Sequence, residues 1–255
     1  MKGKLYGVSL GPGDPGLITR RAWELLGSDA HWTYPVRSAR SESFALDIVQ
    51  RAGLPLPAEH TALVFPMTHD EHKLARYWLQ AAETVLARLT RGEDVLFLVE
   101  GDASTYATFG HLARTVAGLD AEVAIETVPG VSSFNAAAAD LGMPLAETDD
   151  TLAIVPAGYG VAMIDRLLAD FDTLVLLKVK PVLDDLLDLL EARGLLPHSA
   201  FVERVGTREE RQVRDLARLR GETVNYLSLI LVRNPHRERG PIVRGCRKKK
   251  AEAAS

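Results

Sequence analysis

Short apolar runs alternate with longer stretches of helical periodicity along most of the chain. The segment Asp94–Val99 is almost entirely apolar, as is typical of a strand that is buried on both faces of a sheet. His69–Arg91 and Val182–Arg193 instead place apolar residues at helical spacing, and Gly194 supplies a C-terminal stop for the second of these helices. This alternation of strands and helices predicts an α/β fold.

The same pattern gives the order of the elements along the chain. Strands are predicted at Lys4–Leu10, Ala30–Tyr34, Thr61–Phe65, Asp94–Val99, Glu122–Val128, Leu152–Val155, Thr173–Val179, Ala200–Arg204 and Tyr226–Val232. Helices are predicted at Leu17–Leu26, Ser43–Arg51, His69–Arg91, Ser133–Leu141 and Val182–Arg193. We expect Pro35 to stop the second strand.

The domain organisation follows from where this pattern weakens. Gly118–Ala121 lacks a strong element, so a boundary is expected there. We predict an N-terminal α/β domain over residues 1–119 and a C-terminal α/β domain over residues 120–236. Residues 237–255 are charged and small and are predicted to form a disordered tail. The basic run within this tail favours a solvated chain end over a nucleic-acid contact.

The composition narrows the class of protein. Hydrophobic residues make up 47% of the 255 residues and charged residues 25%, which excludes disorder over most of the chain. The net charge of -4 argues against a surface devoted to nucleic acid. No run approaches 18 apolar residues and the N-terminus lacks a signal-peptide core, so we predict a cytoplasmic protein without membrane or nucleic-acid partners. The single cysteine, Cys246, permits no intramolecular disulfide, and its neighbours have the composition of a chain tail, which disfavours a catalytic thiol.

Three glycine-containing junctions between a strand and the next helix are the candidates for ligand binding, because ligands of α/β proteins bind beyond the carboxyl ends of strands. The first junction, Gly7–Gly16, contains Pro12 and Pro15, which remove backbone N–H groups that a pyrophosphate would need. It therefore matches neither the dinucleotide fingerprint nor the Walker A loop. A tight turn capped by Asp14 is an equally good interpretation.

The second junction, Val99–Tyr106, places two acidic residues around Gly101 directly after a buried strand. Gly101 lets a ligand approach the backbone, and Asp102 could accept a hydrogen bond from an ammonium group or a ribose hydroxyl. The alternative is that Asp102 or Ser104 caps the next helix. Two carboxylates are too few for a metal site.

The third junction, Val128–Phe134, is another glycine turn into a helix, and Ser132 is placed as its N-cap. The motif is not that of a serine nucleophile. Elsewhere, His69 and His72 lie three residues apart at the start of a predicted helix, but no third ligand accompanies them. No metal site is therefore predicted.

Taken together, in this order and spacing, the three junctions resemble the tetrapyrrole methylase family, and the resemblance extends from Leu5 to about Arg233. The branch of the family that acts on precorrin-2 is resembled most by Tyr34–Pro35, Ser43–Val49, Phe65–Met67, Pro144–Glu147, Leu152–Pro156, Glu203–Gly206 and Asn225–Leu229. Ala103 stands where this family usually has proline, and Leu177 where methionine is common. Both changes keep shape and apolar character, so they bear on local cofactor geometry rather than on the activity.

The resemblance implies two α/β domains with S-adenosylmethionine in the cleft between them, a tetrapyrrole substrate and a homodimer. The implied reaction is methylation of precorrin-2 at C-20 in cobalamin biosynthesis. The implied cofactor-binding residues are Pro12, Glu100, Gly101, Asp102, Thr105, Ser132, Ser133, Leu177, Tyr226, Leu227 and Ser228. Glu100 and Asp102 are also the candidate catalytic residues, as bases, although the reaction can proceed without one. Because the substrate carries eight carboxylates, Arg20, Arg21, Arg37 and Arg40 are the candidate substrate-binding residues.

Other functions stay open on the sequence. The same methylation could act on the cobalt-carrying ring of the anaerobic route, or at C-11 or C-17 of another corrinoid. Family members that methylate ribosomal RNA or the diphthamide-bearing translation factor are more remote. A non-catalytic S-adenosylmethionine-binding module that regulates a partner would keep the same loops. A dinucleotide oxidoreductase is disfavoured by the prolines of the first junction.

Overall fold

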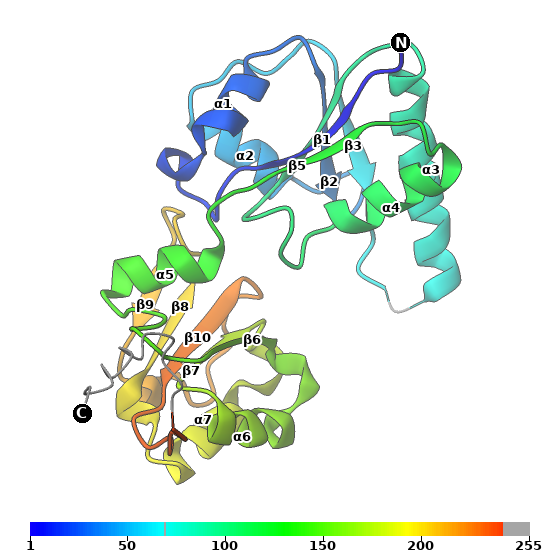
Figure 1. The fold of residues 1–255 in the computed structure, drawn as a ribbon. Helices are drawn as coiled ribbons and strands as arrows, with labels where there is room; N and C mark the ends of the chain where they lie inside the picture. The colour runs from blue at the N-terminus through cyan, green and yellow to red at the C-terminus, as the bar shows by residue number, and fades with distance from the viewer. Residues whose placement is uncertain (69, 242–255) are drawn as a thin grey trace, which may run out of the picture.

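The protein consists of two α/β units, each built on a five-stranded sheet (Figure 1). The computed structural model describes residues 1–68 and 70–241. All strands up to β5 belong to the first sheet and all later strands to the second, so the chain passes only once between the sheets. Within these residues, no helix is both long and apolar enough to cross a membrane.

The first sheet is parallel throughout. Its strands lie in the order β3-β2-β4-β1-β5, with bounds β1 (Leu5–Ser9), β2 (His31–Val36), β3 (His60–Val64), β4 (Val95–Val99) and β5 (Ile125–Val128). Helices α1 (Arg20–Leu26) and α2 (Phe44–Arg51) pack on one face, and α3 (Glu71–Leu89) and α4 (Phe109–Leu119) pack on the other. All five residues of β4 are buried, which confirms the prediction from its apolar sequence.

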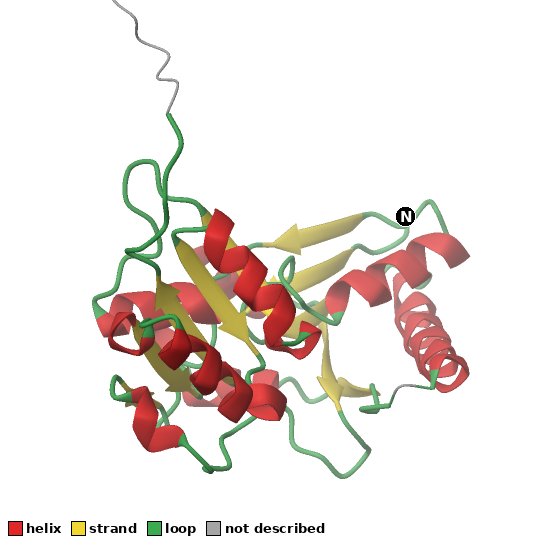
Figure 2. Cartoon of the chain, turned by 90° about the horizontal axis from the view of Figure 1, so that it is seen from below, coloured by secondary structure: helices red, strands yellow, loops and turns green. Residues whose placement is uncertain are grey.

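The second sheet is mixed, with β6 and β7 parallel and the remaining pairs antiparallel. Its order is β6-β7-β10-β8-β9, with bounds β6 (Leu152–Pro156), β7 (Thr173–Leu177), β8 (Ser199–Glu203), β9 (Arg211–Val213) and β10 (Ser228–Arg233). Helices α6 (Val161–Asp170) and α7 (Leu183–Ala192) pack on one face and α5 (Ser133–Leu141) on the other. Short 3₁₀ helices are η1 (Pro15–Leu17), η2 (Ala157–Tyr159), η3 (Lys180–Val182), η4 (Leu196–His198) and η5 (Leu216–Leu219). In the view of Figure 2, helices lie over the strands of both sheets.

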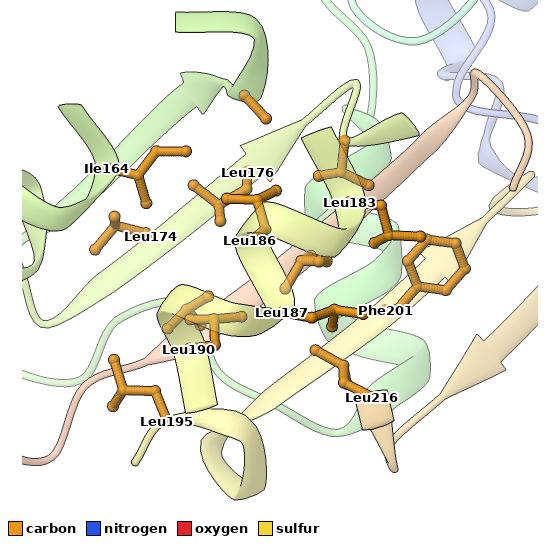
Figure 3. Close-up of a cluster of buried hydrophobic side chains, with 14 of the residues drawn as sticks. Ile164, Leu174, Leu176, Leu183, Leu186, Leu187, Leu190, Leu195, Phe201 and Leu216 are labelled. Atoms are coloured by element: carbon orange, nitrogen blue, oxygen red, sulfur yellow. The ribbon is translucent and has the colours of Figure 1, made fainter. Parts of the chain in front are cut away.

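The core of the second unit shows how the helical spacing is used. Leu183, Leu186, Leu187 and Leu190 of α7 are all buried, and they pack among side chains of the sheet such as Phe201 (Figure 3). Burial of one leucine side chain contributes roughly 1.5–3 kcal/mol. The amphipathic pattern that predicted this helix is therefore also what attaches it to the sheet.

The predicted domain boundary is wrong by one strand. β5 begins after residue 120, yet it pairs in parallel with β1 and completes the first sheet. The first unit therefore extends to Val128, and the second begins with α5. The boundary was placed where the local pattern weakens. The sheet to which β5 belongs depends instead on its pairing with β1, about 120 residues earlier in the chain.

Two α-helices and one strand were not predicted, namely α4, α6 and β9. The expected strand stop at Pro35 is also wrong, since β2 continues to Val36. Beyond Thr33 this strand pairs only with β3, so a residue without an N–H group is tolerated there.

The predicted disordered tail needs a partial correction. Arg237 and Arg239 lie within the described residues and both pair with the buried Asp172, at 2.5 Å and 2.8 Å. Arg239 also pairs at 2.5 Å with Asp150, whose side chain is shielded from solvent. These ion pairs attach the start of the tail to the second unit. Residues 242–255, which include Cys246, and His69 of the histidine pair lie outside the described residues.

Candidate active site

The three glycine junctions predicted from the sequence meet at one edge of the first sheet. They follow β1, β4 and β5, which are neighbouring parallel strands, so their carboxyl ends lie side by side. Gly11 and Gly101 exchange two backbone hydrogen bonds, of 3.2 Å and 2.7 Å, between the first and second junctions. A Cβ atom on Gly13 would lie 2.5 Å from the carbonyl oxygen of Val205, so this edge contacts the second unit (Figure 1).

Ser9 joins all three junctions from the end of β1. Its hydroxyl donates to the carbonyl of Val128 at 2.6 Å and accepts from the N–H of Ala103 at 2.8 Å. The third junction approaches so closely that a Cβ atom on Gly130 would lie 2.3 Å from the Cβ of Ser9. Glycine is therefore required at position 130 by contact with Ser9.

Asp102 connects the second junction to the third. One carboxylate oxygen accepts from the N–H of Gly130 at 2.9 Å, and the other accepts from the N–H of Ser104 at 2.8 Å and from the Ser104 and Thr105 hydroxyls. Burial raises the pKa of this carboxyl, but the hydrogen bonds from Ser104 and Gly130 outweigh it and the pKa lies below its usual value. Asp102 is thus an ionised acceptor whose oxygens are occupied.

The proposed capping roles of these junctions have mixed outcomes. Asp14 caps η1 by accepting from the N–H of Gly16, as expected. Neither Asp102 nor Ser104 caps a helix, because the next one, α4, begins only at Phe109. Ser132 occupies the N-cap position of α5, but its side chain makes no capping hydrogen bond.

The second unit supplies the opposite wall of the site. β7 and β8 both run antiparallel to β10, so the ends of these two strands flank the start of β10. The N–H of Lys178 donates to Ser228 at 3.0 Å, and the N–H of Arg204 donates to Leu227 at 2.8 Å. The Ser228 hydroxyl is buried and has no hydrogen-bond partner in the described structure.

One cavity of about 510 Å³ lies between these two walls. All eleven residues predicted to bind the cofactor line it, although they come from both units: Pro12, Glu100, Gly101, Asp102, Thr105, Ser132, Ser133, Leu177, Tyr226, Leu227 and Ser228. The structure therefore brings together residues that span most of the length of the chain. Within the described part of the chain, no three His, Cys, Asp or Glu side chains are grouped to hold a metal ion.

Glu100 differs from Asp102 in its surroundings. No hydrogen bond is made by its carboxyl group in the described structure, and Arg37 is the one charged group that influences it. Burial raises the pKa of Glu100 to about 7, against a smaller lowering by the positive charge of Arg37. At neutral pH, this carboxyl can therefore both take up and release a proton.

The four candidate substrate arginines are separated by the fold. Arg37 lines the cavity. Arg20 pairs with Glu24 on α1 at 2.9 Å, and Arg21 pairs with Glu126 at 3.3 Å, and neither lines the cavity. Arg40 is exposed and also does not line it.

Sequence reasoning missed two further cations in the cavity wall, Lys178 and Arg204. It also missed an apolar wall on the side of the first unit, formed by Phe44, Phe65, Met67 and Tyr106. The position of Lys178 and Arg204 in the sequence could have indicated their role, since each directly follows a strand of the second sheet. In an α/β unit such positions are the usual places for ligand contacts.

Comparisons with known proteins agree on one family. The sequence profile of the Tetrapyrrole (Corrin/Porphyrin) Methylases matches residues 4–219. The precorrin-2 C(20)-methyltransferase of Sinorhizobium sp is 30% identical over 90% of this chain and 95% of its own length. The cobalt-precorrin-2 C(20)-methyltransferase of Salmonella typhimurium is 34% identical over 91% of this chain and 97% of its own. Among solved structures, uroporphyrin-III C-methyl transferase from Thermus thermophilus, complexed with S-adenyl homocysteine, is 25% identical with a TM-score of 0.60, covering 90% of this chain and 97% of that one.

Proposed function

Because this chain belongs to the tetrapyrrole (corrin/porphyrin) methylase family, we propose that it transfers the methyl group of S-adenosylmethionine to C-20 of precorrin-2, giving precorrin-3A in cobalamin biosynthesis. The observation that carries this proposal is the cavity between the two units, which is lined by every residue that the resemblance assigns to the cofactor. The names of the Sinorhizobium and Salmonella relatives support the position of methylation.

The residues present fit S-adenosylmethionine. The buried Ser228 hydroxyl lacks a partner and can bond a polar group of the cofactor. The space beside Gly101 is open, because a Cβ atom built there meets nothing within 4 Å, so a ligand can approach the backbone. The apolar side chains of Leu177 and Leu227 would contact apolar parts of the cofactor. When bound, S-adenosylmethionine supplies an electrophilic methyl group on a sulfonium sulfur.

The work of the protein is then mainly to position the reactants. The paired Gly11 and Gly101 and the carboxylate of Asp102 hold the three junctions in fixed relation, and the second unit closes the other side. Orienting two reactants in this way can lower a barrier by about 7–11 kcal/mol at best. A cavity between two walls also restricts water around the reacting carbon.

We assign different roles to the two candidate bases. The carboxyl oxygens of Asp102 are occupied by donors from its own and the neighbouring junction, so Asp102 acts as a positioning residue. Glu100 has a free carboxyl group in the cavity wall and takes up the proton that leaves C-20 when the methyl group is added. Arg37, which also lines the cavity, binds a carboxylate of the substrate. Arg20, Arg21 and Arg40 are not included in this proposal, because they lie outside the cavity.

The assembly and location are also proposed from the family resemblance. The enzyme is a homodimer in the cytoplasm. Light scattering during size-exclusion chromatography tests the dimer, since one chain has a mass of 27.8 kDa and a single species of twice that mass is expected. A species at the mass of one chain over a wide range of protein concentration contradicts the dimer.

The experiment that tests the reaction compares two rings. The purified protein is incubated without oxygen with methyl-labelled S-adenosylmethionine and either precorrin-2 or its cobalt complex. We expect one labelled methyl group at C-20 of the metal-free ring, identified by mass and by NMR. The similarity to the Salmonella relative makes the cobalt complex the second candidate substrate. Label in the cobalt complex alone selects that substrate. Binding of S-adenosylmethionine without transfer to either ring refutes the enzyme and supports a regulatory module.

A further inference from the structure

Backbone strain is concentrated around the cavity. Four residues other than glycine have a positive φ in the described structure: Tyr106 (52°), Thr148 (48°), Lys178 (57°) and Arg204 (54°). Three of the four line the cavity, and only Thr148 does not. Glycine adopts this conformation without strain, whereas other residues do so at a cost that is usually tied to a functional site. The strain at these three positions therefore marks their side chains as candidates for contact with a ligand.

Lys178 is the clearest of the three. It directly follows β7, and its backbone N–H is bonded to Ser228 at the start of β10, so its position is fixed by the sheet. No carboxylate of the described residues lies within 4.0 Å of its ammonium group, whereas the guanidinium of Arg204 pairs with Glu209. The side chain of Lys178 is half-buried in the cavity wall. A half-buried ammonium that faces a cavity without an ion-pair partner is available to an anionic ligand.

The aromatic ring of Tyr106 lies close to this ammonium group. The tyrosine belongs to the second junction of the first unit, yet its hydroxyl donates to the carbonyl of Ile154 in the second unit at 3.1 Å. The aromatic ring thus spans the cleft, and the Lys178 nitrogen lies 5.9 Å from its centroid. A ring at this distance attracts a cation. The ring therefore stabilises the ammonium group at the cavity wall.

We propose that Lys178, held over the ring of Tyr106, binds a peripheral carboxylate of the tetrapyrrole substrate. This inference rests on the proposed function, since it takes the substrate to be a ring with eight carboxylates. Arg37 is a cation of the first unit in the cavity wall, and Lys178 is its counterpart in the second unit. A substrate held from both units is fixed relative to the cofactor loops, which a single contact would not achieve.

The experiment measures two binding affinities separately, one for a ring with several carboxylates and one for the cofactor product. Uroporphyrin, a stable ring with eight carboxylates, is titrated into the protein by fluorescence, and S-adenosylhomocysteine is titrated by calorimetry. The variant Lys178→Gln removes the ammonium group, Lys178→Arg keeps a positive charge, and Lys180→Gln is the matched control. Lys180 lies two residues away, is exposed and does not line the cavity.

We expect Lys178→Gln to weaken uroporphyrin binding by about tenfold, with the larger effect at low salt, and to raise the KM for the tetrapyrrole to a similar extent. Lys178→Arg should recover most of the affinity, and Lys180→Gln should resemble the unaltered protein. Binding of S-adenosylhomocysteine should not change in any of them. Equal uroporphyrin affinity and equal KM in Lys178→Gln and Lys180→Gln would overturn the proposal.

A fourth variant separates ligand binding from folding. Lys178→Gly relieves the strain at φ 57° and should raise the melting temperature by about 2–4 °C, while uroporphyrin binding falls as in Lys178→Gln. A lysine with only a structural role would instead leave affinity intact in every folded variant, and that result refutes the inference. Failure of the unaltered protein to methylate either ring refutes the proposed function. Methylation with an unchanged KM in Lys178→Gln refutes only the role of Lys178.

Discussion

The substitution Glu100→Gln tests whether this carboxyl group is held in a desolvated cavity wall. The pKa of Glu100 is raised from 4.5 to about 7 in the folded protein, chiefly by burial. Glutamine has nearly the same shape as the protonated acid and carries no charge at any pH. The substitution therefore removes the cost of burying the carboxylate and leaves packing almost unchanged.

The size and sign of the effect follow from linkage between ionisation and folding. Between pH 4.5 and 7, the unfolded chain ionises Glu100 while the folded protein keeps it protonated, so stability falls as the pH rises through this window. The loss is less than about 1 kcal/mol at pH 5 and reaches about 3 kcal/mol at pH 8, where both states are ionised. Glu100→Gln should recover this amount, so it should be more stable than the parent protein by about 3 kcal/mol at pH 8.

The assay is thermal unfolding of both proteins without ligand at pH 5 and pH 8. At about 2–4 °C for each kcal/mol, we expect the melting temperature of Glu100→Gln to exceed the parent's by roughly 6–12 °C at pH 8, and by only a few degrees at pH 5. The matched control is Glu42→Gln, which neutralises an exposed carboxylate at the rim of the same cavity. It should show no such pH-dependent gain.

The reasoning is refuted if Glu100→Gln gains the same stability at both pH values, or if it is destabilised at both. Either result would mean that the carboxyl group is solvated or bonded in the folded protein. If Glu100 is also the base, the stabilised variant should methylate more slowly at saturating substrate. A stability gain with an unchanged kcat would retain the burial argument and remove the catalytic role.

Three further substitutions test other parts of the structure. Gly130→Ala places a methyl group 2.3 Å from the Cβ of Ser9. It should destabilise the protein by about 1–3 kcal/mol and abolish cofactor binding. Normal cofactor binding in calorimetry would contradict the requirement for glycine at this position. Asp102→Asn leaves the N–H donors of Ser104 and Gly130 with a weaker acceptor. The free energy of unfolding in urea should therefore fall by about 1–3 kcal/mol. An unchanged unfolding midpoint would show that the junctions do not depend on the Asp102 carboxylate. Asp172→Asn tests the ion pairs with the start of the tail: burial raises the pKa of Asp172, but hydrogen bonds from Thr151, Arg239 and Arg237 lower it to about 2, from 3.8. The ionised carboxylate of Asp172 therefore stabilises the fold by about 2 kcal/mol above pH 4. The difference in unfolding free energy between the parent protein and Asp172→Asn should vanish as the pH falls to 2. A difference that stays constant in acid would contradict the lowered pKa of Asp172.

Local periodicity was sufficient for the elements whose burial repeats regularly along the chain. The bounds of α5 agree with the prediction at both ends, and β4 was recognised because every one of its residues is apolar. The α4 segment contains Gly110 and Gly118, which weaken a helical pattern, and it was missed. β9 has only three residues, two of them charged or polar and exposed, so only its pairing with β8 defines it as a strand.

The residues assigned to the cofactor could be expected to lie together because their motifs are short, ordered segments that resemble a family, and all of them line the cavity. Which arginines line the cavity could not be predicted in this way, since an arginine in a sequence carries no sign of its partner. Arg37 reaches the cavity, whereas Arg21 is held by Glu126, a residue more than 100 positions later. Only the folded chain determines which arginine is held in an ion pair and which lines the cavity.

The sequence by itself thus determined the α/β class, the order of most elements, the family and the three junctions that meet at the cavity, because these depend on local spacing. The tertiary structure decided that β5 belongs to the first sheet, that Glu100 is desolvated while Asp102 is bonded, and that Lys178 lies over Tyr106 across the cleft. Each of these depends on the packing of one unit against another or of distant strands within a sheet. Burial, charge pairing and backbone strain arise from such contacts, and no window along the sequence contains them.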